Sequence, residues 1–390
     1  MAAQSLTRGT VSATLALALL SAGCQRAHTV SAADVPAFEV SLATGNQHSA
    51  LAWHGGSAAH DVIYLQVLNQ RGRAIGEPRP ITRGQSAAYE PDLQSFADGW
   101  LLSWYEQHPT EKTLIAWLAA LDGAGELRWK QALSAPGSDG RSPVVRSSGA
   151  QIHVAWIETH AGEAPAVWIA SFDHAGRRLA GPIRAADAST DTWNLNAAVD
   201  AAGNFHVVYD ATLGTQGKEL QLLRIAGDEV KQRRLSADDG HASVYPDIAL
   251  STDQAALTWF DSRDGNEEIY LYTGALATLF SDGDIAGQRI TQTPGASSGA
   301  YLAWNGSRLG LAWCDNISNQ NEIFFATFDS GGKPLVAARQ LTRTAAQSAI
   351  PSIRPWGSGF AIAWNEYQLG DSSAGQAGIA SSAAMLQIVE

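Results

Sequence analysis

An aromatic residue at the end of a short apolar run returns seven times at nearly equal intervals along the chain. Successive copies are 50 to 54 residues apart, and all but the fourth carry tryptophan. The positions are Trp53, Trp104, Trp156, Tyr209, Trp259, Trp313 and Trp364. A fixed period of this length is typical of one supersecondary unit repeated around or along an axis. Residues 38–390 therefore form one repeat domain, and not the two or three domains that a chain of this length would otherwise suggest.

Each repeat contains four short runs that are rich in β-branched and aromatic residues. Turns with Gly, Asp or Asn separate the runs, as in Asp122-Gly-Ala-Gly125 and Asp329-Ser-Gly-Gly332, and no helical period is sustained. Four antiparallel strands in about 50 residues make one blade of a β-propeller. The sequence thus predicts an all-β fold, a seven-bladed propeller over residues 38–390. The repeated aromatic residue would pack between neighbouring blades.

The last repeat is shorter than the others. Eleven residues remain after Ile379, whereas repeat six uses eighteen residues from Ile323 to Leu341. Blade seven therefore lacks a full outer strand of its own. We expect the segment 24–37, and within it Thr29 to Ala37, to supply an N-terminal strand that closes the ring and covers the exposed edge.

The start of the chain has the features of a secretory signal. Arg8 precedes an apolar run from Val11 to Leu20, and small residues follow up to Cys24. The ending Leu20-Ser-Ala-Gly-Cys24 resembles the lipobox of bacterial lipoproteins, which are cut before a cysteine that then carries acyl chains such as palmitate. The resemblance implies a signal peptide over 1–23, lipidation at Cys24 and a membrane-anchored tether. The alternative is an ordinary signal peptide with an incidental cysteine.

The residue after Cys24 bears on the location that this resemblance implies. Gln25 stands there, and not the aspartate that favours retention at the inner membrane in lipoproteins of enterobacteria. The resemblance therefore implies a lipid-anchored protein of the outer membrane, and leaves open which side of that membrane it faces. Several acyl chains, at about 0.8 kcal/mol per buried CH₂, hold a protein without a spanning helix.

One repeat shows a second resemblance. The segment from Trp259 to Tyr270, Trp-Phe-Asp-Ser-Arg-Asp-Gly-Asn-Glu-Glu-Ile-Tyr, is similar to the repeat of secreted bacterial propellers related to the TolB and BNR groups. The intact Ser-x-Asp-x-Gly-x-Thr-Trp box of BNR sialidases is missing from the sequence. Ala120-Leu-Asp122 with Gly125 and Trp129 approximates, once, the blade ending of propellers such as the outer-membrane assembly lipoprotein BamB.

One position of the repeat is acidic without an evident packing reason. It lies two residues after the aromatic residue, or one residue after it in the fourth repeat. The residues are Glu106, Glu158, Asp210, Asp261, Asp315 and Glu366. Loops after the second strand and loops entering the next blade open on one face, so six carboxylates would line one end of the disc. They form a binding surface for a basic ligand, or each caps its own loop and pairs with neighbours such as Arg263.

Other candidate residues are few. Trp193, in the polar stretch from Ala188 to Asn194, lies in a predicted connection between blades and is a candidate for stacking on a sugar or peptide. His48, His54 and His60 do not have zinc spacing and are expected in loops. The motifs of hydrolase nucleophiles, phosphate loops and zinc proteases are missing from the sequence. We therefore predict neither a metal nor another cofactor.

Charge narrows the partners. The net charge of −12 argues against nucleic acid and favours a protein or glycan ligand, basic if it is charged. Two classes of function remain. The first is a non-catalytic binding or scaffolding lipoprotein of the cell envelope, with a BamB-like assembly factor as one form of it. The second is a sialidase-like propeller hydrolase or lyase acting on glycans.

Overall fold

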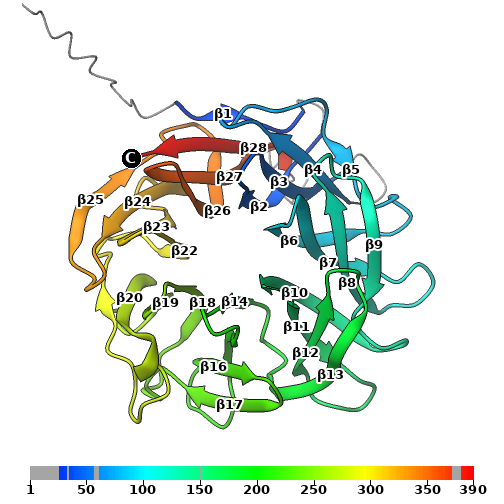
Figure 1. Cartoon of the computed structure of the whole chain (residues 1–390). Helices are drawn as coiled ribbons and strands as arrows, with labels where there is room; N and C mark the ends of the chain where they lie inside the picture. Colours follow the sequence, from blue (N-terminus) through cyan, green and yellow to red (C-terminus); the bar gives the residue numbers. More distant parts are fainter. Residues whose placement is uncertain (1–25, 33–34, 57–60, 150, 371–378) are drawn as a thin grey trace, which may run out of the picture.

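The computed structural model describes residues 26–390 apart from 33–34, 57–60, 150 and 371–378. Seven four-stranded antiparallel sheets surround a common axis, so the predicted seven-bladed propeller is confirmed (Figure 1). Within the described residues the one helical element is the short 3-10 turn η1 (Leu276–Thr278). The signal segment and Cys24 lie outside the described residues, as does His60.

The strands occupy equivalent places in each blade. The innermost strands are β2 (Phe38–Thr44), β6 (Ala88–Phe96), β10 (Asp139–Ser148), β14 (Leu195–Val199), β18 (Ser243–Leu250), β22 (Ser297–Asn305) and β26 (Gln347–Trp356). The second strands are β3 (Ser49–Gly55), β7 (Gly99–Gln107), β11 (Gln151–Thr159), β15 (Phe205–Ala211), β19 (Gln254–Asp261), β23 (Arg308–Asp315) and β27 (Gly359–Leu369).

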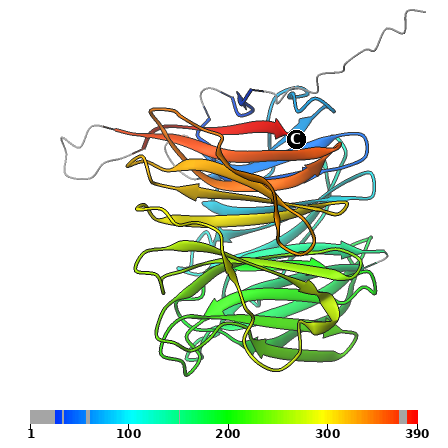
Figure 2. The ribbon, with the colours of Figure 1, turned by 90° about the vertical axis from the view of Figure 1, so that its left-hand side faces the viewer.

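The outer half of each blade completes the sheet. The third strands are β4 (Val62–Leu68), β8 (Leu114–Asp122), β12 (Ala166–Asp173), β16 (Glu219–Ala226), β20 (Glu268–Ala275), β24 (Glu322–Phe328) and β28 (Ile379–Val389). The outermost strands are β5 (Arg79–Pro80), β9 (Leu127–Ala132), β13 (Arg178–Asp187), β17 (Glu229–Arg234), β21 (Gln288–Arg289), β25 (Pro334–Gln340) and β1 (His28–Thr29). Figure 2 shows the sheets stacked around the ring from the side.

Blade seven is closed by the start of the chain. Strand β1 pairs with β28 and places His28 opposite Leu386, so the expected closure by an N-terminal strand is confirmed. The strand is shorter than expected and begins one residue earlier, at His28. Val30 continues the pairing, because its N–H donates to the carbonyl of Ala384 at 2.8 Å, and its side chain joins the core.

The repeated aromatic residues are buried between blades, as the sequence predicts. Trp104 of β7 packs in one cluster with Ala52 and Leu65 of the preceding blade. Trp53 of β3 packs in one cluster with Leu386 of blade seven. The first and last blades are therefore joined by the same kind of aromatic contact as the other pairs of blades. Tyr209, where tryptophan is replaced, is fully buried and donates its hydroxyl to the carbonyl of Asp187 at 2.9 Å.

The innermost strands share one irregularity near their first residues. In six blades the pairing with the second strand skips a register step there, which is the mark of a β-bulge. Each bulge holds a residue with positive φ: Glu39, Glu90, Ser142, Tyr245, Gly299 and Ile350. We call these six residues the bulge rim. We call the end of the disc where the innermost strands begin and the second strands end the bulge face.

Candidate functional site

The acidic residues of the repeat lie on the bulge face, as expected, because each stands at or near the end of a second strand. Their side chains are nevertheless largely withdrawn from solvent. Glu158, Asp210, Asp261 and Asp315 are buried, and Glu106 and Glu366 are partly buried. In the described part of the chain, none of the six lines the axial cavity. The structure therefore does not bring these carboxylates together around the channel mouth.

The contacts of these carboxylates are local. The indole N–H of Trp156 donates to Glu158 at 2.6 Å, and Trp104 makes the same bond to Glu106 at 3.0 Å. Glu158 also accepts from the hydroxyl of Ser138 at 2.6 Å and from the N–H of Ala135 at 2.9 Å, both in the connection from the preceding blade. These are the contacts of loop caps. The burial of the acidic residues gives no support to a role in ligand binding.

Asp210 and Asp315 follow the same scheme with other partners. Asp210 accepts from the N–H of Tyr245 in the next blade at 2.7 Å, and it pairs with Lys218 at 2.9 Å. Asp315 accepts from the hydroxyl of Ser297 at 2.7 Å and from the N–H of Ile317 at 2.8 Å. Asp210 thus ties the end of β15 to the innermost strand of the next blade, and Asp315 ties the end of β23 to β22 and to the loop that follows.

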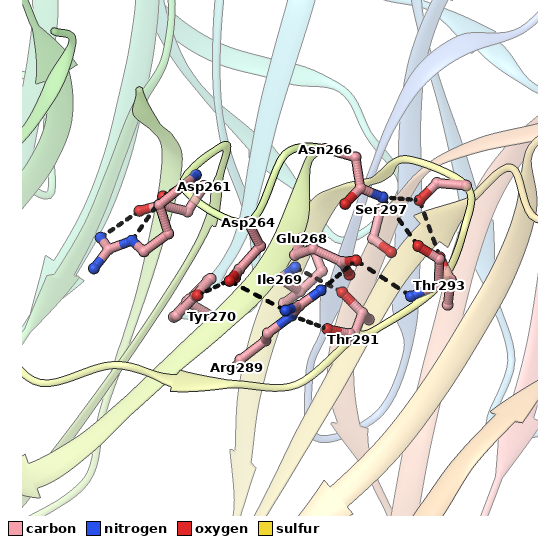
Figure 3. Close-up of polar contacts among 12 residues, drawn as sticks. Asp261, Asp264, Asn266, Glu268, Ile269, Tyr270, Arg289, Thr291, Thr293 and Ser297 are labelled. Carbon is pink, nitrogen blue, oxygen red and sulfur yellow. Dashed lines mark hydrogen bonds and ion pairs between the residues drawn. The ribbon is translucent and has the colours of Figure 1, made fainter. Parts of the chain in front are cut away.

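The segment that resembles other secreted propellers forms a polar network in blade five (Figure 3). Asp261 accepts from the indole N–H of Trp259 at 3.1 Å and pairs with Arg263 at 2.6 Å. Asp264 accepts from the hydroxyl of Tyr270 and lies 3.1 Å from Arg289. Arg263, a predicted ligand contact, is engaged with its own loop.

Arg289 extends this network to the buried side of the blade. Its guanidinium donates to Glu268, which is fully buried, at 2.9 Å, and to the carbonyl of Thr291 at 2.8 Å. Asn266 reaches the connection to the next blade through the carbonyls of Thr293 and Gly295, at 3.0 and 2.7 Å (Figure 3). The network therefore joins two loops of the bulge face and leaves their side chains occupied.

Trp193 is the one sequence-predicted residue that lines the axial cavity. Its side chain is 49% exposed, in the connection that leads into β14. The guanidinium of Arg141 lies over the ring at 4.4 Å from its centre, a cation–π contact that fixes the indole. The hydroxyl of Ser142 donates to the carbonyl of Trp193 at 2.7 Å. Trp193 thus stands beside the bulge rim, in the only blade of the described chain whose innermost strand has no bulge.

The axial cavity has a volume of about 960 Å³ and is lined by the innermost strands of all seven blades. All six bulge-rim residues line the wall of this cavity. The innermost strands run in the same direction around the ring, so residues at equal positions lie at equal depth. The rim is therefore one layer of the cavity. A volume in this range is typical of small-molecule and peptide sites.

The rim is strained. Positive φ costs about 1 to 2 kcal/mol for a residue with a Cβ atom, and Ile350, at φ 53°, is β-branched. Such residues persist where the surrounding structure holds them, and they concentrate at functional sites. The sequence carried a signal that was not used: proline follows the bulge residue in four repeats, at Pro91, Pro143, Pro246 and Pro351. Proline within a strand marks an edge or a bulge, because it cannot donate to the ladder.

Rim residues of blades one and two belong to a cluster of ionisable groups. His54 lies 3.2 Å from Glu39 and 3.3 Å from Asp61, and Glu39 accepts from the N–H of Glu90 at 3.1 Å. Although burial alone would lower it, hydrogen bonds to Asp61 and Glu39 raise the pKa of His54 to about 9. His54 was expected in a loop, and this was wrong. It is a buried residue of β3, because Trp53 and His54 point to opposite faces of a strand covered on both sides.

Glu90 is the second unusual group of this cluster. Burial and the nearby charge of Glu39 raise the pKa of Glu90 to about 7. The hydroxyls of Ser142, at 2.8 Å, and Tyr105, at 3.3 Å, donate to its carboxylate and limit the rise. The mouth of the cavity therefore carries carboxylates on one side, from Glu39 and Glu90. The exposed apolar side chains of Tyr245 and Ile350, with that of Trp193, belong to other blades.

Two further findings concern metal ions and membrane-spanning helices. Within the described residues, no group of three or more His, Cys, Asp or Glu side chains is arranged to hold a metal ion. No helix in the same part of the chain is long and apolar enough to cross a membrane.

Comparison with known proteins shows the fold. No family model matches the sequence, and no curated protein matches it. A protein of unknown function from Dyadobacter fermentans superposes with a TM-score of 0.55 at 12% identity, over 94% of this chain and 99% of that one. The endosialidase of phage phi92 superposes with a TM-score of 0.56 at 9% identity, over 94% of this chain and 69% of that one.

A third structure is a puromycin-hydrolysing peptidase of Mycobacterium tuberculosis. It superposes with a TM-score of 0.56 at 13% identity, over 91% of this chain and 55% of that one. The chain is thus a propeller with structural neighbours of several activities. At these identities the similarity shows the fold alone.

Proposed function

We propose that the protein is a non-catalytic binding protein of the bacterial cell envelope, which holds a segment of a protein or glycan partner at the bulge rim. The observation that carries this proposal is the rim itself. Six blades place a residue with positive φ at the same depth of one open cavity, and five of these six residues carry a Cβ atom. Blade four forms the same four-stranded sheet without a bulge, and strain at a cavity wall is typical of a binding surface.

The chemistry of the rim suits a partner with both polar and apolar parts. Trp193, Tyr245 and Ile350 are 49%, 43% and 38% exposed, which is unusual for large apolar side chains that share one cavity wall. Aromatic faces stack on sugar rings or on apolar side chains. The carboxylates of Glu39 and Glu90 accept hydrogen bonds from hydroxyl or ammonium groups.

The anchor belongs to the same proposal: a lipid at Cys24 holds the protein at the outer membrane. Cys24 stands four positions before His28, a reach of at most about 14 Å. Strand β1 forms the outer edge of blade seven, on the circumference of the disc (Figure 1). An anchor there would present the disc edge-on to the membrane and leave the bulge face open to a partner from the side.

The experiment compares two double variants of matched exposure. Trp193→Ala with Tyr245→Ala removes one aromatic side chain of the bulge rim and the one beside it. Leu179→Ala with Leu335→Ala removes side chains on outermost strands that are 52% and 51% exposed. Each protein is used to capture partners from detergent-solubilised envelope, and captured glycans and proteins are then titrated by calorimetry. The rim variant should weaken the partner's binding at least tenfold and the control should not. Equal binding of the partner by both variants would refute the proposal that the rim is the binding surface.

One observation favours a second candidate, a glycan hydrolase. Glu90 combines a pKa of about 7 with a tyrosine hydroxyl at 3.3 Å, and a general acid works best with a pKa near the working pH. Purified protein would be incubated with envelope glycans, and released reducing ends would be counted. Turnover that Glu90→Gln abolishes would establish the hydrolase. If the parent protein binds its partner but shows no turnover, the hydrolase is refuted and the binding function stands.

A further inference from the structure

The wall of the axial cavity carries two arginine residues inside the bulge rim. Arg146 of β10 and Arg354 of β26 both stand four residues after the rim residue of their strand, Ser142 and Ile350. At about 3.3 Å per residue, this position lies about 13 Å further along the axis. Because equal positions lie at equal depth, the two guanidinium groups belong to one layer of the cavity, although 208 residues separate them in the sequence.

The two arginine residues differ in their partners. Arg146 donates to Asp92 at 2.6 Å and to the carbonyl of Ala197 at 2.7 Å. Arg354 donates from one nitrogen to the carbonyl of Ile353 at 2.8 Å. Among the described residues, its other two nitrogens have no acceptor, and no carboxylate lies within 4.0 Å of the group. Arg354 thus offers free donors to the cavity.

The two carboxylates near Arg354 are hydrogen-bonded to other groups. Asp92 is engaged with Arg146 and with the N–H of Val145, at 2.8 Å. Asp247 accepts from the N–H of Leu302 at 2.7 Å, and burial raises the pKa of Asp247 to about 6. Burial and the neighbouring charge of Arg146 lower the pKa of Arg354, and the charges of Asp92 and Asp247 offset this only in part. A partly buried guanidinium without a directly bonded carboxylate is costly, and an anionic ligand would relieve that cost.

We infer that Arg354, with the free nitrogen of Arg146, forms an oxyanion site that binds a carboxylate or phosphate group carried into the axial cavity. The planar guanidinium presents paired N–H donors that match either group in a bidentate contact. The chain as a whole is negative, with a net charge of −12, so recognition must be short-range and local. This inference rests on the proposed function only in that the partner would carry the anion. The site itself is testable without a partner.

The test is calorimetric titration of the purified protein with sodium phosphate and, separately, sodium acetate. Chloride keeps the ionic strength constant, and the two arms tell which anion chemistry fits. We expect saturable binding of at least one anion. Arg354→Gln should weaken the affinity for the anion at least tenfold. Arg354→Lys keeps the charge but loses the paired N–H donors, so its affinity should lie between those of the parent protein and Arg354→Gln. Arg177→Gln, on an arginine whose side chain is 83% exposed in a distant turn, is the matched control.

Two results would overturn the inference: heats no larger than those of chloride alone, or saturable binding that Arg354→Gln leaves unchanged. Melting curves without added anion show whether Arg354→Gln is folded. Arg354→Lys supplies the measurement if it is not. The double variant Trp193→Ala with Tyr245→Ala should still bind the anion, because its substitutions lie at the rim. Partner capture that this double variant leaves unchanged, together with intact anion binding, would therefore refute the proposed function alone.

Discussion

Asparagine in place of Asp261 should destabilise the protein by about 3 kcal/mol, because the carboxylate is a structural cap. Its two oxygens accept from Ser243 at 2.7 Å, from Trp259 at 3.1 Å and from three nitrogens of Arg263 at 2.6 to 3.0 Å. Asparagine keeps the shape but turns one acceptor into a donor that faces other donors. Breaking a buried ion pair costs about 3 to 5 kcal/mol, and the lower end applies because Arg263 is 33% exposed.

The measurement is a thermal melt. For 390 residues the entropy of unfolding is about 0.8 kcal/mol/K, so 3 kcal/mol lowers the melting temperature by about 4 °C. Glu106→Gln is the control. Its carboxylate is partly exposed and holds one indole at 3.0 Å and Lys130 at 3.4 Å, so we expect a loss of about 1 kcal/mol.

The pH dependence gives a second readout. Burial alone would raise the pKa of Asp261, but the hydrogen bonds from Arg263 and Ser243 dominate and lower it. A lowered pKa contributes stability above the unfolded value of about 3.9, and this contribution is lost as the pH falls through the folded value. The difference in melting temperature between the parent protein and Asp261→Asn should therefore become smaller below about pH 4. A variant that melts at or above the parent would instead indicate a surface of mutually repelling charges.

Three other predictions concern the anchor, the closure and the rim. Cys24→Ala should move the protein from the membrane fraction to the soluble fraction or leave it unprocessed, and unchanged fractionation would contradict the lipid anchor. A chain that starts at residue 33 loses β1 and the burial of Val30, so it should lose about 2 to 3 kcal/mol in a melt. Light scattering should also show self-association through the bared edge of β28, and a monomer of parental stability would contradict the closure. Gly299→Ala should cost about 1 kcal/mol in a melt although the nearest atom to the added Cβ is 3.8 Å away, because φ is +58°. An unchanged melting temperature would mean that the rim is not strained.

The architecture could be predicted because it depends on contacts that repeat along the chain. One tryptophan per blade fills the space against the preceding blade, so its period of 50 to 54 residues counts the blades. The short last repeat indicated the closure for a similar reason. A ring with one strand missing has an unpaired edge, and His28 and Thr29 supply the partner.

The site could not be predicted in the same way, because it depends on bulges and on ring closure. A bulge adds one residue to a strand and changes which side chains point to which face. The alternation of the sequence therefore did not show that Glu39, Glu90 and Tyr245 line the cavity. It also left open whether Asp261 and its counterparts form a surface ring or cap their loops, and their carboxylates in fact bond within their own blade or to an adjacent blade or connection.

Only the closed ring decides which distant residues share a depth. Arg146 and Arg354 belong to blades three and seven, and nothing local in either repeat relates them. The seven innermost strands run in one direction around one axis, so position within a strand becomes depth in the cavity. The sequence by itself determined the blades and their number. The tertiary structure determined the cavity wall, because that wall is made from one short piece of every blade.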